Sequence, residues 1–67
     1  MKKTSEDKLR LILFSNTSLS YLELEMYEDA LKNAEEALKI QKDHQKSLHR
    51  KATAHARIAE EKAKKDM

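Results

Sequence analysis

The chain has 67 residues, of which 39% are charged, and a formal net charge of +2. It contains no cysteine, which excludes disulfides and thiolate metal sites, and no glycine or proline, which favours a single small all-helical domain over residues 1–67. A net charge this small indicates neither a nucleic-acid nor a membrane partner. The charges are unevenly distributed: acidic residues outnumber basic ones seven to three in 23–43, and basic residues outnumber acidic ones seven to three in 44–67.

The N-terminal residues do not resemble a targeting segment. Arg10 interrupts the short apolar run "LRLILF", and no small-residue cleavage site follows it. No stretch of the chain approaches the roughly 20 apolar residues that a transmembrane helix requires. We therefore expect a cytoplasmic protein that does not bind a membrane.

The first predicted helix covers residues 5–24. Thr4 or Ser5 offers a capping hydroxyl at its start, and acidic residues follow in the first turn. Apolar residues occupy several sides of this helix, which is typical of an internal element with neighbours on more than one flank. The main face holds Leu11, Phe14, Ser18, Tyr21 and Leu22, with Ile12 and Leu19 on a second side and Leu13 and Leu24 on a third.

The second predicted helix covers residues 27–41 and has one narrow apolar stripe. The small residues in this stripe permit a close approach of another helix. Glu28–Lys32 and Glu35–Lys39 are favourable i,i+4 pairs, each worth about 0.2–0.5 kcal/mol. The stripe comprises Tyr27, Ala30, Leu31, Ala34, Ala37 and Leu38.

The third predicted helix covers residues 44–65, with Asp43 as a candidate cap. Neither junction, at 24–26 or at 41–44, contains a glycine or a proline that would enforce a break. The second and third helices could therefore fuse, or exchange between chains in a domain swap. The residues expected to face inward on the third helix are Leu48, Ala52, His55, Ala59 and Ala63.

The sequence repeats weakly with a period of 34 residues, which places Phe14 on Leu48, Ser18 on Ala52 and Tyr21 on His55. Helix–turn–helix units of this length are typical of tetratricopeptide repeats, whose pattern is W-x2-L-G-x2-Y followed by A-x3-F and P. The chain matches this pattern with Phe14-x2-Thr17-Ser18-x2-Tyr21, then Ala30-x3-Ala34, then Ala37.

The segment from about Leu11 to Ala59 thus resembles one and a half tetratricopeptide repeats of the co-chaperone type found in immunophilins. The resemblance implies an antiparallel array of a helix–turn–helix unit and a third helix. Two positions depart from the family pattern: Glu25 stands where the turn usually has glycine, and Lys42 stands where proline usually follows the second helix. Both departures weaken the helix breaks.

In co-chaperones of this type, a carboxylate clamp binds the acidic C-terminal Glu-Glu-Val-Asp tail of heat-shock chaperones. The resemblance assigns Asn16, Lys46 and Arg50 to this clamp. Thr53 and Arg57 extend the same face of the third helix, since they follow Lys46 at i+7 and i+11. Arginine offers a bidentate fork to a carboxylate and lysine a point charge. A complete clamp also needs a lysine and an asparagine from a preceding repeat, so we expect weak binding.

Other interpretations of the same residues remain open. Lys46, Arg50, Thr53 and Arg57 form a basic row on the third helix, and such a row is also typical of an ordinary solvent-exposed helix face. Asn16 also fits an exposed polar position that has no binding role. His44, His49 and His55 lie five and six residues apart, which does not match the i,i+4 spacing of a metal-binding pair. No nucleophile, phosphate-loop or zinc motif is present, so we expect no enzyme, no cofactor and no metal.

Two functions follow. The first is a protein-interaction module that binds an acidic C-terminal peptide. The second is a structural element, a repeat fragment or an engineered unit, that forms homo-oligomers or belongs to a larger repeat array, because such arrays need about three repeats to bury a continuous core. Nucleic-acid binding is not expected, since no aromatic residues alternate with the cations of the third helix.

Overall fold

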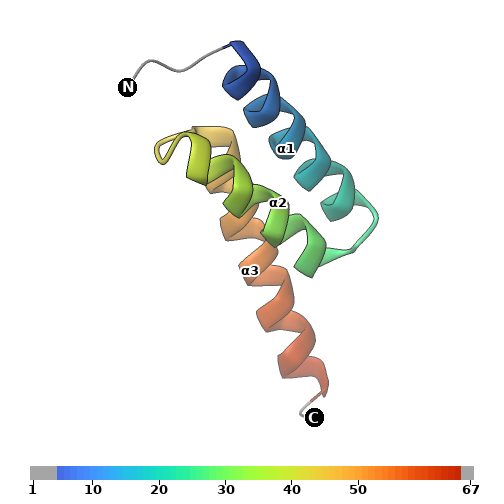
Figure 1. The fold of residues 1–67 in the computed structure, drawn as a ribbon. Coiled ribbons are helices and arrows are strands. Elements are labelled where there is room, and N and C mark those ends of the chain that lie inside the picture. The colour runs from blue at the N-terminus through green and yellow to red at the C-terminus, as the bar shows by residue number, and fades with distance from the viewer. Residues whose placement is uncertain (1–4, 66–67) are drawn as a thin grey trace.

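A computed structural model describes residues 5–65 and shows an all-α array of three helices (Figure 1). The helices are α1 (Ser5–Glu23), α2 (Tyr27–Ile40) and α3 (Gln45–Lys65), so the bounds lie within one residue of those expected from the sequence. α2 runs antiparallel to α1 and to α3 and lies between them in the chain order. None of the helices in this range is long and apolar enough to cross a membrane. Thr4, a candidate cap, lies outside the described residues.

α1 and α2 pack closely through small residues. Ser18 and Ala30 are both fully buried, and Ser18 Oγ donates a hydrogen bond of 2.6 Å to the Ala30 carbonyl oxygen. Larger side chains flank this contact and are half-buried, among them Phe14 and Tyr21. The inner faces predicted for both helices are confirmed: Leu11, Ser18, Ala30, Ala34 and Ala37 are buried, and Phe14, Tyr21, Leu22, Tyr27, Leu31 and Leu38 are half-buried.

The turn between α1 and α2 has the hydrogen bonds of a Schellman motif. The Met26 amide donates to the Tyr21 carbonyl oxygen at 2.8 Å, and the Glu25 amide donates to the Leu22 carbonyl oxygen at 3.1 Å. Glu25 has a φ of 62°, the left-handed conformation that this motif requires at the residue after the helix cap. Because glycine adopts this conformation without steric cost, Glu25 occupies a strained position.

The chain also turns between α2 and α3, which are separate helices. Gln41 is extended, with φ −143° and ψ 106°, so the helical path stops there without a proline. His44, not Asp43, caps α3: its Nδ1 lies 3.3 Å from the Ser47 amide nitrogen, which donates to it, and 2.7 Å from Ser47 Oγ. This arrangement places the imidazole over the first turn of α3 and buries Ser47 completely.

α3 packs on α2 through a face that the sequence did not predict. Ser47 and Ala54 are fully buried, and Lys51 and Ile58 are half-buried. Leu48, which was expected inside, is 40% exposed. The other residues predicted to face inward, Ala52, His55, Ala59 and Ala63, are exposed as well.

The physical reason for this error lies in the repeat. Leu48, Ala52 and His55 are the equivalents of the α1 residues that pack on the helix following α1. No helix follows α3 in the described part of the chain, so this flank of α3 is uncovered. α3 instead contacts α2 through the neighbouring flank.

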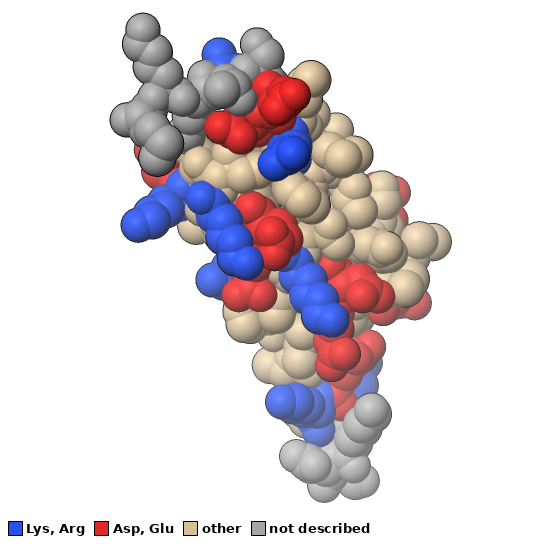
Figure 2. Space-filling view, viewed as in Figure 1, with Lys and Arg blue, Asp and Glu red and all other residues tan. Residues whose placement is uncertain are grey.

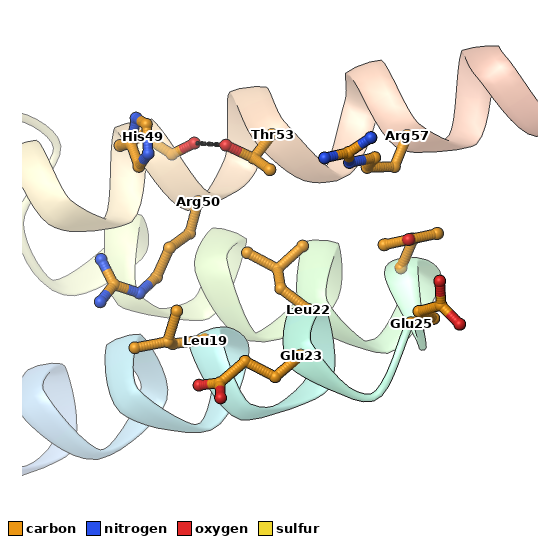
Figure 3. Close-up of a pocket in the computed structure, with 9 residues that line it drawn as sticks. Leu19, Leu22, Glu23, Glu25, His49, Arg50, Thr53 and Arg57 are labelled. Carbon is orange, nitrogen blue, oxygen red and sulfur yellow. Dashed lines mark hydrogen bonds between the residues drawn. The ribbon is translucent and has the colours of Figure 1, made fainter.

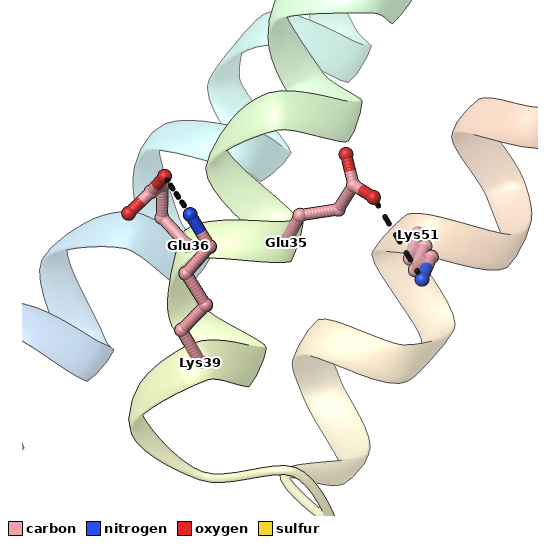
Figure 4. A network of polar contacts seen from close by, with 4 residues as sticks. All are labelled: Glu35, Glu36, Lys39 and Lys51. Carbon is pink, nitrogen blue, oxygen red and sulfur yellow. Dashed lines mark hydrogen bonds and ion pairs between the residues drawn. The ribbon is translucent and has the colours of Figure 1, made fainter.

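Surface charges surround α2. Lys39 Nζ lies 3.0 Å from Glu36 Oε1, and Lys51 Nζ on α3 lies 3.9 Å from Glu35 Oε2 (Figure 4). The predicted pair Glu35–Lys39 is therefore replaced by a contact between α2 and α3. All four side chains are at least partly exposed, so each pair contributes at most about 1 kcal/mol.

Candidate functional site

A groove of about 480 Å³ lies between the second half of α1 and α3. It is the place where the basic row of α3 faces α1 (Figure 3). Its volume lies within the usual range for pockets that hold small ligands or peptide side chains. The lining residues are Leu19, Leu22 and Glu23 of α1, Glu25 of the turn, Tyr27 at the start of α2, and His49, Arg50, Thr53 and Arg57 of α3.

Arg50 is the cation that reaches across the groove. Its side chain extends from α3 toward α1, beside Leu19 (Figure 3). Within residues 5–65 its guanidinium makes one hydrogen bond, from Nη1 to the Lys46 carbonyl oxygen at 3.0 Å. Its Nε is buried and has no partner. An arginine presents five N–H donors. With the Nε donor buried and one Nη1 donor used, three donors on Nη1 and Nη2 are left for a ligand.

The other polar groups of α3 in the groove are partly engaged. Thr53 Oγ1 donates to the His49 carbonyl oxygen at 2.9 Å, which leaves the hydroxyl lone pairs free to accept. Arg57 Nη1 lies 3.2 Å from Glu60 Oε2, so the positive charge of Arg57 is shared with a neighbour on its own helix. Arg50 therefore carries the least compensated positive charge of the groove.

Two carboxylates line the same groove. Glu23 ends α1 and Glu25 sits in the strained turn. Both side chains are exposed, and neither takes part in an ion pair or side-chain hydrogen bond in the described chain. The groove thus carries both signs of charge, with an apolar wall between them formed by Leu19 and Leu22.

The structure brings together three of the five predicted binding residues. Arg50, Thr53 and Arg57 line the groove. Asn16 and Lys46 are exposed and do not line it. Asn16 lies near the middle of α1, about one turn before Leu19, and Lys46 lies in the first turn of α3, one turn before Arg50.

Sequence reasoning missed the remaining lining residues. Leu19 was predicted to lie on a second apolar side of its helix, but the sequence did not indicate which neighbouring helix this side faces. The roles of Glu23 and Glu25 depend on the turn geometry and on the parallel course of α1 and α3, neither of which appears as a residue pattern. His49 enters the groove because α3 is rotated relative to the predicted orientation.

A second candidate surface is the outer face of α1. Leu9 and Leu13 are 66% and 61% exposed, and Leu24 after the helix is 67% exposed. Few charges interrupt the surface over α1 in Figure 2, whereas charged residues crowd over α2. Such a run of exposed aliphatic residues is typical of an interaction surface.

The 34-residue shift relates this outer face to a face that is covered. Leu13, Thr17, Ser20 and Leu24 are the equivalents of Ser47, Lys51, Ala54 and Ile58, through which α3 packs on α2. On α1 Leu13, Ser20 and Leu24 are exposed and Thr17 is half-buried, whereas on α3 Ser47 and Ala54 are buried and Lys51 and Ile58 are half-buried.

Within residues 5–65, no three histidine, aspartate or glutamate side chains group closely enough to hold a metal ion. Comparison of the chain with protein-family models, with curated proteins and with solved structures finds no match.

Proposed function

We propose that this chain is a protein-interaction module that binds an acidic C-terminal peptide in the groove between α1 and α3. The observation that supports it most is Arg50, whose guanidinium extends toward α1 inside a groove of about 480 Å³ and keeps most of its donors unused. The resemblance to tetratricopeptide co-chaperones also assigns Arg50 to a carboxylate clamp, although the other two clamp residues, Asn16 and Lys46, lie outside the groove. It suggests the acidic tail of a heat-shock chaperone as the partner.

The chemistry of the site suits a carboxylate next to an apolar side chain. A carboxylate can accept two parallel hydrogen bonds from the arginine fork, and these bonds are shorter and stronger than neutral ones. In Arg50 this fork is formed by the two terminal nitrogens, of which only Nη1 makes a hydrogen bond in the described chain. Leu19 and Leu22 offer an apolar wall for the neighbouring side chain of the peptide.

Asn16 and Lys46 would extend the site beyond the groove. Lys46 precedes Arg50 by one helical turn, and Asn16 precedes Leu19 by nearly one turn on α1. A peptide that continued from the groove toward the N-terminal ends of both helices would pass between them. The lysine would then contribute a second positive charge and the asparagine an amide donor.

The expected affinity is low. One available arginine and one exposed lysine are the uncompensated cations on this path, and exposed charge contacts contribute about 0–1 kcal/mol each. We expect a Kd near 1 mM, which corresponds to about −4 kcal/mol. The affinity should fall as salt is added, because the contacts are at the surface.

Calorimetric titration with a peptide ending in Glu-Glu-Val-Asp tests this proposal. Arg50→Ala should abolish binding. Arg50→Lys, which keeps the charge but removes the fork, should weaken it, and Lys46→Ala should weaken it as well. The matched control is Lys32→Ala, which removes an exposed lysine from α2 outside the groove. Binding that is indifferent to Arg50→Ala and to salt would refute the proposal.

A second function, an assembly element, is supported by the outer face of α1. Its exposed leucines occupy the repeat positions that α3 uses to pack on α2. A helix with the chemistry of α2, from a second copy or from a larger repeat array, would cover this face. Light scattering over a range of concentrations tests it, since a constant monomer mass would argue against self-association.

A further inference from the structure

Two buried polar atoms, one on α1 and one on α3, have no hydrogen-bond partner within residues 5–65: Ser15 Oγ and Arg50 Nε. We infer that Ser15 is a positioning residue for Arg50. When a carboxylate binds the two terminal nitrogens of the guanidinium, the Ser15 hydroxyl accepts the Nε–H and holds the guanidinium in place. This inference rests on the proposed peptide-binding function and adds to it a residue that does not line the groove.

The two atoms are chemically complementary. The Nε–H of an arginine can only donate, whereas a serine hydroxyl can accept as well as donate. Ser15 is 2% exposed, so water does not reach its hydroxyl from the surface. Almost all buried polar groups in folded proteins have a hydrogen-bond partner. An unpartnered donor and an unpartnered acceptor on two neighbouring helices are therefore natural partners for each other.

The fold brings the two side chains to the same place between the helices. Figure 3 shows Arg50 extending from α3 to α1, with its guanidinium beside Leu19 and toward the start of α1. Ser15 precedes Leu19 by four residues and so lies one turn earlier on the same side of α1. Leu19 is 39% exposed in the groove wall, whereas Ser15 is buried. Ser15 thus lies beneath the groove, at the depth where the Nε of Arg50 is buried as well.

The geometry of the arginine fork leaves the Nε–H free for this contact. A carboxylate bound by the fork takes one N–H from each terminal nitrogen, and the Nε–H lies outside this fork. Presenting the fork to a ligand requires a change in the side-chain torsion angles of Arg50, and this change brings the Nε–H to the Ser15 hydroxyl. A guanidinium held at Nε cannot turn away from the ligand, so Ser15 raises the affinity without touching the peptide.

Removal of the hydroxyl should affect stability and binding differently. Ser15→Ala keeps a small side chain, and it removes a buried hydroxyl that has no partner in the free chain. Urea denaturation should therefore show a variant at least as stable as the unmodified chain. Its affinity for a peptide ending in Glu-Glu-Val-Asp, measured by NMR titration, should nevertheless fall by about two- to tenfold, as expected for the loss of one hydrogen bond.

The matched control is Ser20→Ala, which makes the same substitution at an exposed position of the same helix. It carries the same gain in helix propensity and should leave the affinity unchanged. A double-mutant cycle then identifies the partner of the hydroxyl. Arg50→Lys has no Nε–H, so Ser15→Ala should cause no further loss of affinity in this background.

The side-chain NMR signal of the Arg50 Nε–H reports the contact directly, and its disappearance in Arg50→Lys assigns it. Addition of peptide should shift this signal in the unmodified chain much more than in Ser15→Ala, because only the unmodified chain forms the hydrogen bond. Equal shifts in the two chains would overturn the inference.

The binding results separate this inference from the proposed function. Equal affinity of Ser15→Ala and the unmodified chain, with binding still abolished in Arg50→Ala, would overturn the inference alone. A loss of stability in free Ser15→Ala would also overturn it, since the hydroxyl would then have a structural role. Peptide binding that does not depend on Arg50 would overturn both.

Discussion

Ser18 on α1 donates a hydrogen bond of 2.6 Å to the backbone carbonyl oxygen of Ala30 on α2, and both residues are fully buried. This contact joins a side chain of one helix directly to the backbone of the next, which is possible only because both residues are small. It fixes how closely the two helices approach and thereby how α1 is presented to α3 across the groove.

Substitution of Ser18 should show that space matters more here than the hydrogen bond. Ser18→Ala removes one hydrogen bond and should lower the free energy of unfolding by about 0.5–1.5 kcal/mol. Ser18→Leu forces a large side chain between two helix backbones and should cost at least about 1–3 kcal/mol. Urea denaturation followed by circular dichroism measures both. A Leu variant as stable as the Ala variant would contradict this packing.

The strained turn predicts a stabilising substitution. Glu25→Gly places glycine at a φ of 62° and should raise the free energy of unfolding by about 1 kcal/mol, because a residue with a Cβ pays about 1–2 kcal/mol in this conformation. Glu25→Ala is the matched control, since it removes the same charge but keeps the Cβ. Thermal unfolding should show a higher Tm for the Gly variant only; equal Tm values for Gly and Ala would rule out strain.

The cap of α3 gives a third prediction. His44→Ala removes the acceptor of the Ser47 amide and should lower the free energy of unfolding by about 1 kcal/mol. His44→Asn supplies another side-chain acceptor at the same position and should retain most of the stability. The two variants are compared by chemical denaturation, and Asp43→Ala should be nearly neutral, because the cap is not at Asp43. A large loss of stability in Asp43→Ala would contradict the assignment of the cap to His44.

The outer face of α1 gives a prediction about assembly. If this face binds a second copy, Leu13→Lys and Leu24→Lys should lower the average mass measured by light scattering, because a lysine cannot be buried there without a partner. Gln45→Lys, which adds the same charge at an exposed position on α3, should leave the mass unchanged. Association that survives both leucine substitutions would place the contact elsewhere.

The sequence was sufficient for the helices and for the α1–α2 interface. The absence of glycine and proline, the spacing of Leu11, Ser18 and Tyr21, and the alanine stripe of α2 all depend on local periodicity, and the structure confirms the faces that they predict. The turns were harder to predict. Capping by His44 instead of Asp43, and the left-handed Glu25, depend on backbone geometry that no residue type specified here.

The orientation of α3 could not be obtained from its own residues. Its two candidate flanks differ little in apolar content, since one carries Leu48 and Ala52 and the other Ala54 and Ile58. The choice between them depends on which neighbouring helices exist. The same dependence explains the site. Arg50 was predicted from the resemblance and Thr53 from its position on the same helix face, whereas Glu23 and Glu25 enter the groove only through the three-dimensional path of the turn.

The most direct test of the central claim, that the groove between α1 and α3 binds an acidic C-terminal peptide, is a titration of the isotope-labelled chain followed through its backbone amide NMR signals. We expect the signals of Leu19, Arg50 and Thr53 to shift progressively as a peptide ending in Glu-Glu-Val-Asp is added, and to stay in place in Arg50→Ala. Shifts confined to the outer side of α2, around Lys32 and Lys39, or no shifts at millimolar peptide, would contradict the claim.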